Sequence, residues 1–198
     1  MRQPSLENVF KEMFAAIDVC LKSNIKVPAL LRAYTLIDIA GGLIAMANRG
    51  RYFTDWLEKY MLPNGTLPCS SLELYGARCG LLHNYSATSN LGASGPVRRV
   101  FYAWRPSRAD GLAKLISFNT QMMAQLGKDV EQIVAVQAED ILSALQTGVD
   151  KFLSDIASDP QRATRANAKA ENMMVENQEA DIQSLIAAAK KVLADSMK

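Results

Sequence analysis

Apolar side chains recur at steps of three and four residues through almost every long segment of this 198-residue chain. The first segment opens at Pro4 and Ser5, and its apolar positions are Leu6, Val9, Phe10, Met13, Phe14, Ile17 and Leu21. One face of an α-helix has this period, whereas a strand would alternate every second residue. The sequence therefore predicts a helix from about residue 5 that ends near Asn24, and a helical protein beyond it.

Three further helices are predicted before residue 90. A mostly apolar helix is expected over about 28–48, where Gly41 and Gly42 indicate a close approach of another backbone, since each glycine costs about 1 kcal/mol relative to alanine in a helix interior. The segment "RYFTDWLEKYML" is expected to form a shorter helix capped by Thr54. Ser70 and Glu73 have the spacing of a capping box and predict the start of the next helix.

The second half of the chain also has helical period. An apolar stripe that begins with Leu112, Leu115, Ile116, Met122 and Met123 is expected to continue from Val130 to Ile156, with a break at Pro160 and a last helix around residues 182–193. The run "RRVFYAW", residues 98–104, is predicted to be an edge strand or a lone ribbon. The predicted fold class is therefore all-α: a helical bundle with additional C-terminal helices and at most one short strand or ribbon.

Composition narrows the classes of partner. The chain carries 22 basic and 20 acidic side chains, a net charge of +2, so any contact with nucleic acid should be local, such as one cleft. Cys20, Cys69 and Cys79 lack metal-ligand spacing, and with a single histidine they predict reduced thiols, no metal and no cofactor. The longest apolar run, residues 39–47, is shorter than the ~20 residues of a membrane span. We expect a soluble cytoplasmic protein without a membrane partner.

The stretch "YGARCGLLHNYS", residues 75–86, holds the only histidine, His83, five positions after Arg78. Five residues of ideal helix separate two side chains by about 140°, so both meet one ligand only if the helix loosens at Gly80 or if two copies of the motif line one cleft. An imidazole and a guanidinium suit metal-independent cleavage of RNA, with His83 as acid and base and Arg78 as phosphate clamp. A two-fold dimer would supply two histidines, which predicts that activity requires dimerisation.

The string "ARCGLLH" resembles the R-x(4–6)-H signature of the HEPN superfamily, small helical bundles common in prokaryotic defence and toxin–antitoxin systems. The preceding "LIDIAGGL" and "FTDWLEKYM" add to the likeness, which covers roughly residues 5–86. The resemblance implies a bundle that dimerises, with Arg78 and His83 of both copies lining a cleft. Many members are metal-independent ribonucleases, and others are binding or assembly modules. Active members often have Asn, Asp or His after the arginine, where this chain has Cys79.

Residues 1–95 are accordingly assigned to a HEPN-like core, and residues 96–198 to a helical extension packed with it as one domain. Around the motif, Asp38, Cys79 and Asn84 are candidate supporting residues, although Asp38 could equally form an ion pair within the bundle. In "RRVFYAWRPSR", Arg98 and Arg99 are candidate RNA-binding residues or solvated charges on a strand that covers the core.

Three functions stay open from the sequence: RNA cleavage or binding, a non-catalytic module that binds a nucleotide or a protein, and an oligomerisation scaffold. The expected partners are a second copy of the chain, RNA or a nucleotide, and a cognate antitoxin or other protein.

Overall fold

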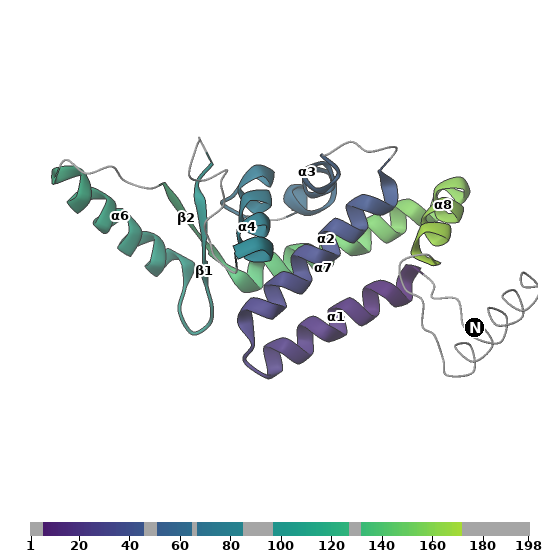
Figure 1. Cartoon of the computed structure of the whole chain (residues 1–198), viewed down its shortest axis with the longest axis horizontal. Coiled ribbons are helices and arrows are strands. Elements are labelled where there is room, and N and C mark those ends of the chain that lie inside the picture. Colours follow the sequence, from purple (N-terminus) through teal and green to yellow (C-terminus); the bar gives the residue numbers. More distant parts are fainter. Residues whose placement is uncertain (1–5, 46–50, 65–66, 85–96, 127–131, 172–198) are drawn as a thin grey trace, which may run out of the picture.

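The computed structural model describes residues 6–45, 51–64, 67–84, 97–126 and 132–171, apart from the side chains of residues 64, 83, 84 and 171. Within these residues the protein is mostly helical, as predicted, and a small two-stranded sheet lies beside the helices (Figure 1). The elements in chain order are α1 (Leu6–Lys22), α2 (Lys26–Ile44), α3 (Tyr52–Trp56), the π-helical turn η1 (Leu57–Met61), the 3₁₀ turn η2 (Leu62–Asn64), α4 (Ser71–Asn84), β1 (Arg99–Ala103), α6 (Ala109–Gln125), β2 (Ile133–Gln137), α7 (Ala138–Ala157) and α8 (Pro160–Glu171).

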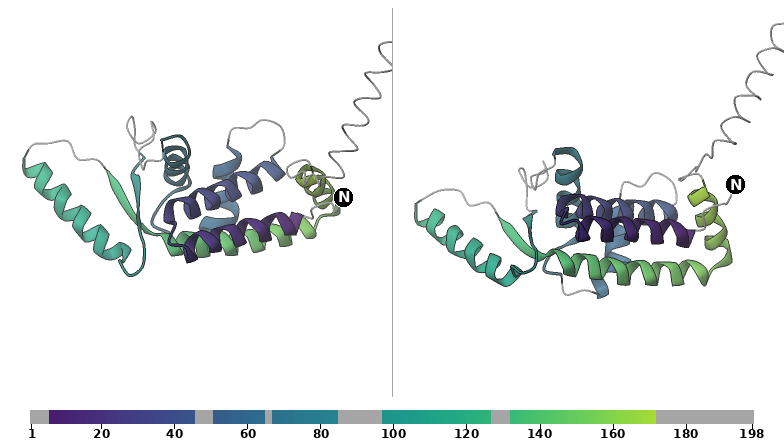
Figure 2. Two further views of the ribbon diagram at one scale, coloured as in Figure 1. Left: turned by 60° about the horizontal axis from the view of Figure 1, so that its bottom comes forward. Right: turned by 90° about the horizontal axis from the view of Figure 1, so that it is seen from below.

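Helix α1 ends where the sequence predicted. Asn24 has a positive φ of 56°, its N–H donates to the carbonyl of Leu21 at 3.0 Å, and the N–H of Ile25 donates to the carbonyl of Cys20 at 2.7 Å. These two bonds form a Schellman motif, in which asparagine is one of the few side chains that tolerate the left-handed position. The chain turns there and runs back as α2, which packs along α1 (Figure 2).

Helix α2 is the centre of the bundle and packs against α1, α3, α4, α7 and α8. Its Gly41 is a close-approach position: a Cβ there would lie 2.6 Å from the carbonyl oxygen of Tyr52, whereas a Cβ on Gly42 would meet nothing within 4 Å. The predicted close approach is therefore confirmed at Gly41 only. Of the helices that the structure describes, α2 alone is long and apolar enough to cross a membrane, and half of that apolar stretch is buried within the bundle.

The predicted cap at Thr54 is wrong. Arg51 is the N-cap residue of α3, and Thr54 lies within the first turn, where its hydroxyl donates to the carbonyl of Arg51 at 3.0 Å. Trp56 and Tyr60 of this segment are buried. They pack on α7 at Gly148, where a Cβ would lie 3.2 Å from the ring of Trp56 and 3.2 Å from the carbonyl oxygen of Tyr60.

The strand-like run at residues 98–104 is not a lone ribbon, because a second strand lies beside it. β1 pairs in parallel with β2, with Val100 opposite Val134 and Tyr102 opposite Val136. The sequence analysis had placed residues 133–137 in a helix. The run "IVAV" is short, apolar and mostly β-branched, and such a run does not reveal by its period whether it is a strand or part of a buried helix. Parallel strands need a crossover, and α6 supplies it.

The core joins residues from both halves of the chain. The ring of Phe152, on α7, contacts three aromatic rings of the first half at centroid distances of 5.9 Å to Phe10, 6.1 Å to Trp56 and 5.3 Å to Tyr60. Buried residues of β1 and β2 extend the same core to the side of the bundle. Helix α6 stands apart: it packs on the strands and projects from the end of the molecule opposite α8 (Figures 1 and 2).

Candidate functional site

The helix that carries the sequence motif begins at the predicted capping box. The N–H of Ser70 donates to the carboxylate of Glu73 at 2.7 Å, and the N–H of Glu73 donates to the hydroxyl of Ser70 at 3.2 Å. These reciprocal bonds satisfy two of the backbone donors that a helix start leaves without partners. The helix α4 then runs without interruption through Gly80 to Asn84, so it does not loosen between Arg78 and His83.

Arg78 is paired with Asp38, which lies on α2. Its Nε and Nη2 both donate to Oδ2 of Asp38 at 2.9 Å, and the two side chains are 19% and 18% exposed. Burial raises the pKa of the Asp38 carboxyl above its ordinary value, although Arg78 acts in the opposite direction. Burial alone would lower the pKa of Arg78, but the bond from Asp38 outweighs it and the pKa is raised. The guanidinium is therefore a fixed positive charge between two helices.

The remaining contacts of Arg78 are weaker. Its Nη1 lies 3.8 Å from the sulfur of Cys79, and its guanidinium carbon lies 6.0 Å from the ring centre of Tyr75. Asp38 Oδ1 is buried without a hydrogen-bond partner among the described residues. A phosphate would thus have to share the Arg78 fork with Asp38 or displace it, because two of its donors already face that carboxylate.

The side chains of His83 and Asn84 lie outside the described residues. Their backbone forms the last two positions of α4. Because α4 is continuous, helix positions 78 and 83 lie about 140° apart around its axis. Convergence of the two in a groove between copies stays a prediction.

Arg98, predicted to contact RNA, ties the start of β1 to the start of α4. Its Nε donates to one oxygen of Glu73 at 2.5 Å, while Nη2 donates to the other at 3.1 Å and to the carbonyl of Pro68 at 3.0 Å. Although burial opposes ionisation of Glu73, Arg98 holds the pKa of this carboxyl below its ordinary value. Arg99 lies with its guanidinium carbon 5.8 Å from the ring centre of Phe101.

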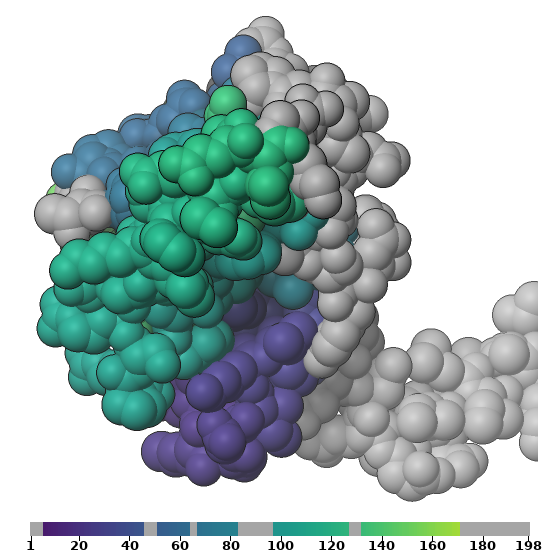
Figure 3. Space-filling view, turned by 90° about the vertical axis from the view of Figure 1, so that its left-hand side faces the viewer, coloured from purple at the N-terminus to yellow at the C-terminus, as the bar shows by residue number. Residues whose placement is uncertain are grey.

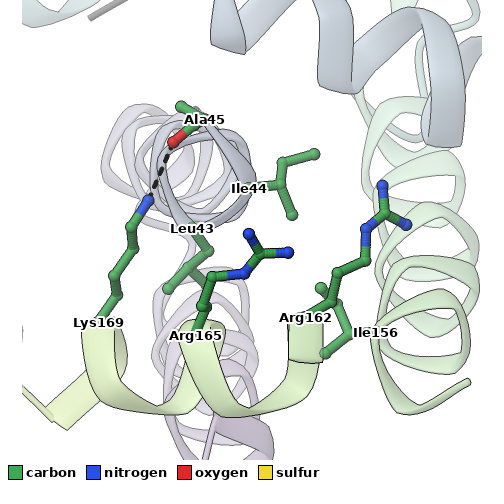
Figure 4. Close-up of a pocket in the computed structure, with 7 residues that line it drawn as sticks. All are labelled: Leu43, Ile44, Ala45, Ile156, Arg162, Arg165 and Lys169. Carbon is green, nitrogen blue, oxygen red and sulfur yellow. Dashed lines mark hydrogen bonds between the residues drawn. The ribbon is translucent and has the colours of Figure 1, made fainter. Parts of the chain in front are cut away.

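A cavity of about 290 Å³ lies between the end of α2 and the helices α7 and α8. Three cationic side chains of α8 and the apolar ends of α2 and α7 line it (Figure 4): Leu43, Ile44, Ala45, Ile156, Arg162, Arg165 and Lys169. Two of the cations already serve the fold. Lys169 donates to the carbonyls of Gly42 and Ala45 at 3.1 Å each, and Arg162 pairs with Asp155 at 3.2 Å. Of the three cations that line this cavity, Arg165 alone makes no ion pair or hydrogen bond among the described residues.

The surface of α6 is the feature that sequence analysis missed. None of the 17 residues of α6 is buried. One row of side chains, which we call the α6 stripe, follows the helix at steps of three and four residues and comprises Gly111, Leu115, Phe118, Met122 and Leu126. Leu115, Phe118 and Leu126 are between 62% and 64% exposed and Met122 is 45% exposed.

The α6 stripe faces away from the strands. The residues of α6 that are half-buried against the sheet lie on an adjacent face: Ala109, Leu112, Ile116, Thr120 and Met123. The segment from β1 to α6 covers much of the end of the molecule seen in Figure 3. The sequence analysis placed Leu115 and Met122 in one apolar stripe with Leu112, Ile116 and Met123. The sequence did contain one signal of this exposed face. The apolar residues of α6 spread over a wider arc of the helix than a two-stranded sheet can cover.

Comparison with family models, with curated proteins and with solved structures gives no match for this chain, so that membership of the HEPN superfamily stays a prediction.

Proposed function

We propose that this chain is a protein-interaction module that binds another polypeptide through the α6 stripe. One observation carries the proposal: a 17-residue helix projects from the fold, buries none of its residues, and exposes Leu115, Phe118 and Met122 in one row. Exposed apolar side chains that stand singly are ordinary on a protein surface, but a contiguous row marks an interaction site. Half of the large apolar side chains that are exposed in the described residues belong to this one segment, which ends at Leu126.

The chemistry of α6 favours a polypeptide as the ligand. Asp110 and Lys114 are its only charged residues, and neither belongs to the stripe. A surface that binds nucleic acid presents several cations to the phosphates, which α6 lacks. An amphipathic helix whose apolar residues follow steps of three and four is the surface that another helix or an apolar groove recognises.

Photo-crosslinking in the native host tests this function. Phe118 is replaced by p-benzoylphenylalanine, which keeps an aromatic ring in the stripe, and Ser117, which is exposed beside it and faces away from the stripe, is replaced in the control. We expect protein adducts from position 118 that are absent from position 117. Equal adducts at both positions, or none at either, would remove the proposal.

A second candidate is metal-independent cleavage of RNA by Arg78 and His83 at a cleft between two copies. The supporting observation is that Asp38 orients the Arg78 guanidinium and stabilises its charge. Incubation of the purified chain with mixed RNA in EDTA tests it, and we expect cleavage that His83→Ala abolishes. Equal cleavage by both proteins would identify a contaminating nuclease and eliminate this candidate.

A further inference from the structure

We infer that the polypeptide bound by the α6 stripe is a second copy of this chain, in an antiparallel helix pair whose two-fold axis crosses α6 between Phe118 and Asn119. The inference rests on the proposed function, because it names the partner of the same surface. It differs from the dimer expected from the Arg78 and His83 motif, which would use the end of α4.

The spacing of the stripe supports the two-fold axis. A two-fold axis perpendicular to a helix pairs residues that are equally far from the crossing point on opposite sides of it. From the midpoint between Phe118 and Asn119, Leu115 is as far as Met122, and Gly111 is as far as Leu126. Every member of the stripe other than Phe118 therefore has an equidistant partner in the stripe, and Phe118 itself lies at the axis. This symmetry lets two copies of the stripe meet residue for residue in an antiparallel pair.

The shapes at the paired positions are also complementary. A Cβ added to Gly111 would meet nothing within 4 Å, so the surface beside this residue is open. The antiparallel pairing brings Leu126 of the second copy, 64% exposed in the single chain, to this open position. At the axis, the two Phe118 rings lie next to each other, where offset or edge-to-face packing is favourable.

Charge permits the self-association. Identical surfaces that carry a net charge repel each other, but the stripe contains no charged residue. The two charged residues of α6, Asp110 and Lys114, lie outside the stripe and have opposite signs. Two copies can therefore approach through this face without burying an unpaired charge.

The area of the stripe predicts a reversible dimer. Its four large side chains expose roughly 400 Å² per copy, taking about 100 Å² for each. A pair would bury about 800 Å² through these residues, which is below the ~1,200 Å² at which stable interfaces begin. We therefore expect a dimer that dissociates on dilution in the micromolar range.

The residues beyond Glu171, where a last helix was predicted around residues 182–193, lie outside the described residues. The described chain ends with α8, and α8 and α6 lie at opposite ends of the molecule (Figure 1). A second copy reaches the stripe directly, with its own α6.

Sedimentation velocity over a concentration series tests the pairing. Phe118→Lys places two like charges at the axis and should weaken dimerisation at least tenfold, whereas Ser117→Lys adds the same charge to the face turned away and should leave it unchanged. Both residues are exposed, so neither change disturbs the core. A wild-type chain that stays monomeric up to about 1 mM, or equal loss in both variants, would overturn the inference.

Disulfide trapping tests the antiparallel register. Leu115→Cys mixed with Met122→Cys should form a mixed disulfide dimer on mild oxidation, with the wild-type chain as control for its three native thiols. Leu115→Cys alone should cross-link poorly, because its two copies would lie about 10 Å apart along the helix. A parallel pair would reverse this order and contradict the inference.

The photo-crosslinked adducts at position 118 distinguish the proposed interaction function from the proposed pairing with a second copy. Adducts at position 118 that consist of the chain itself support both. Adducts to a different protein only, with a purified chain that is monomeric, leave the interaction function standing and overturn the second copy as its partner.

Discussion

Among single residues, the Arg78–Asp38 pair shows how a motif residue can serve the fold. The pKa of Asp38 is raised. Removal of its carboxylate from water therefore costs more free energy than the hydrogen bonds and charge of Arg78 contribute. Such a pair is weak evidence for stability as a whole, but the loss of either partner leaves the other charge poorly solvated. The pair therefore links α2 and α4 independently of anything that α4 binds.

This reasoning predicts an asymmetric mutant cycle. Asp38→Ala should lower the free energy of unfolding by about 2 kcal/mol, because Arg78 stays behind at 19% exposure without its acceptor. Addition of Arg78→Met to that variant should recover most of the loss, since no unpaired charge then remains. Urea unfolding of the wild type, the two single variants and the double variant measures the coupling. Strictly additive losses would show that the pair does not couple the helices.

Rules that use only neighbouring sequence positions predicted the structural roles of some residues and not of others. The capping box at Ser70 and Glu73 and the end of α1 at Asn24 follow from chemistry within one or two turns, and the structure confirms both. It also confirms, at Gly41, the close approach of another backbone that the glycine pair predicted. Thr54 was misassigned because a threonine hydroxyl satisfies a carbonyl in the first turn as readily as it caps the helix. The pairing of Arg98 with Glu73 joins residues 25 positions apart, and no local pattern announces it.

At the scale of elements, the crossing of α2 and α3 depends on a missing side chain. The carbonyl oxygen of Tyr52 lies where a Cβ of Gly41 would be, at 2.6 Å, and backbone atoms cannot give way as a flexible side chain can. The neighbouring Gly42 has open space instead. Substitution by alanine is therefore expected to destabilise the fold at Gly41 and to stabilise it at Gly42.

Gly41→Ala should lower the free energy of unfolding by about 2 kcal/mol or more, because α3 must shift away from α2. Gly42→Ala should raise it by up to about 1 kcal/mol, since alanine is the better helix former and nothing obstructs its methyl group. Thermal melts followed by circular dichroism compare the two variants. A destabilised Gly42→Ala, or a Gly41→Ala that melts with the wild type, would contradict the packing of these helices.

Periodicity predicted where α6 would be apolar but not what would cover it. Leu112 and Ile116 are half-buried on the side of the strands, whereas Leu115 and Phe118, on the next face, are 64% and 62% exposed in the described chain. Both faces are equally apolar in the sequence. A hydrophobic pattern indicates that a face is buried, but it does not indicate which segment or which protein buries it. β2 was missed for a related reason: four apolar residues beside a helix do not define their own period.

For the molecule as a whole, one carboxylate links the middle of the chain to its later helices. Oδ2 of Asp155, on α7, accepts from Tyr60 at 2.5 Å and from Lys59 at 2.8 Å, both on η1, and from Arg162 on α8 at 3.2 Å. Three elements thus meet at a single oxygen. Since α7 also carries the ring of Phe152 that contacts the core aromatics, this junction joins η1 and α8 to a helix of the core.

The junction predicts a component of acid unfolding. Lys59 first, then Tyr60, lower the pKa of Asp155 from its ordinary 3.8 to about 2. The unfolded chain therefore takes up this proton more readily than the folded chain, so the stabilisation is present above the ordinary value and is lost as the pH falls towards about 2. Asp155→Asn, which has no such proton to bind, should lose stability less steeply than the wild type over this range, and Lys59→Met should show an intermediate slope. Urea midpoints measured from pH 5 downwards give these slopes.

Because Asp155 is 35% exposed, the difference should shrink in high salt. Parallel slopes for all three proteins would show that η1, α7 and α8 are held together by apolar packing alone.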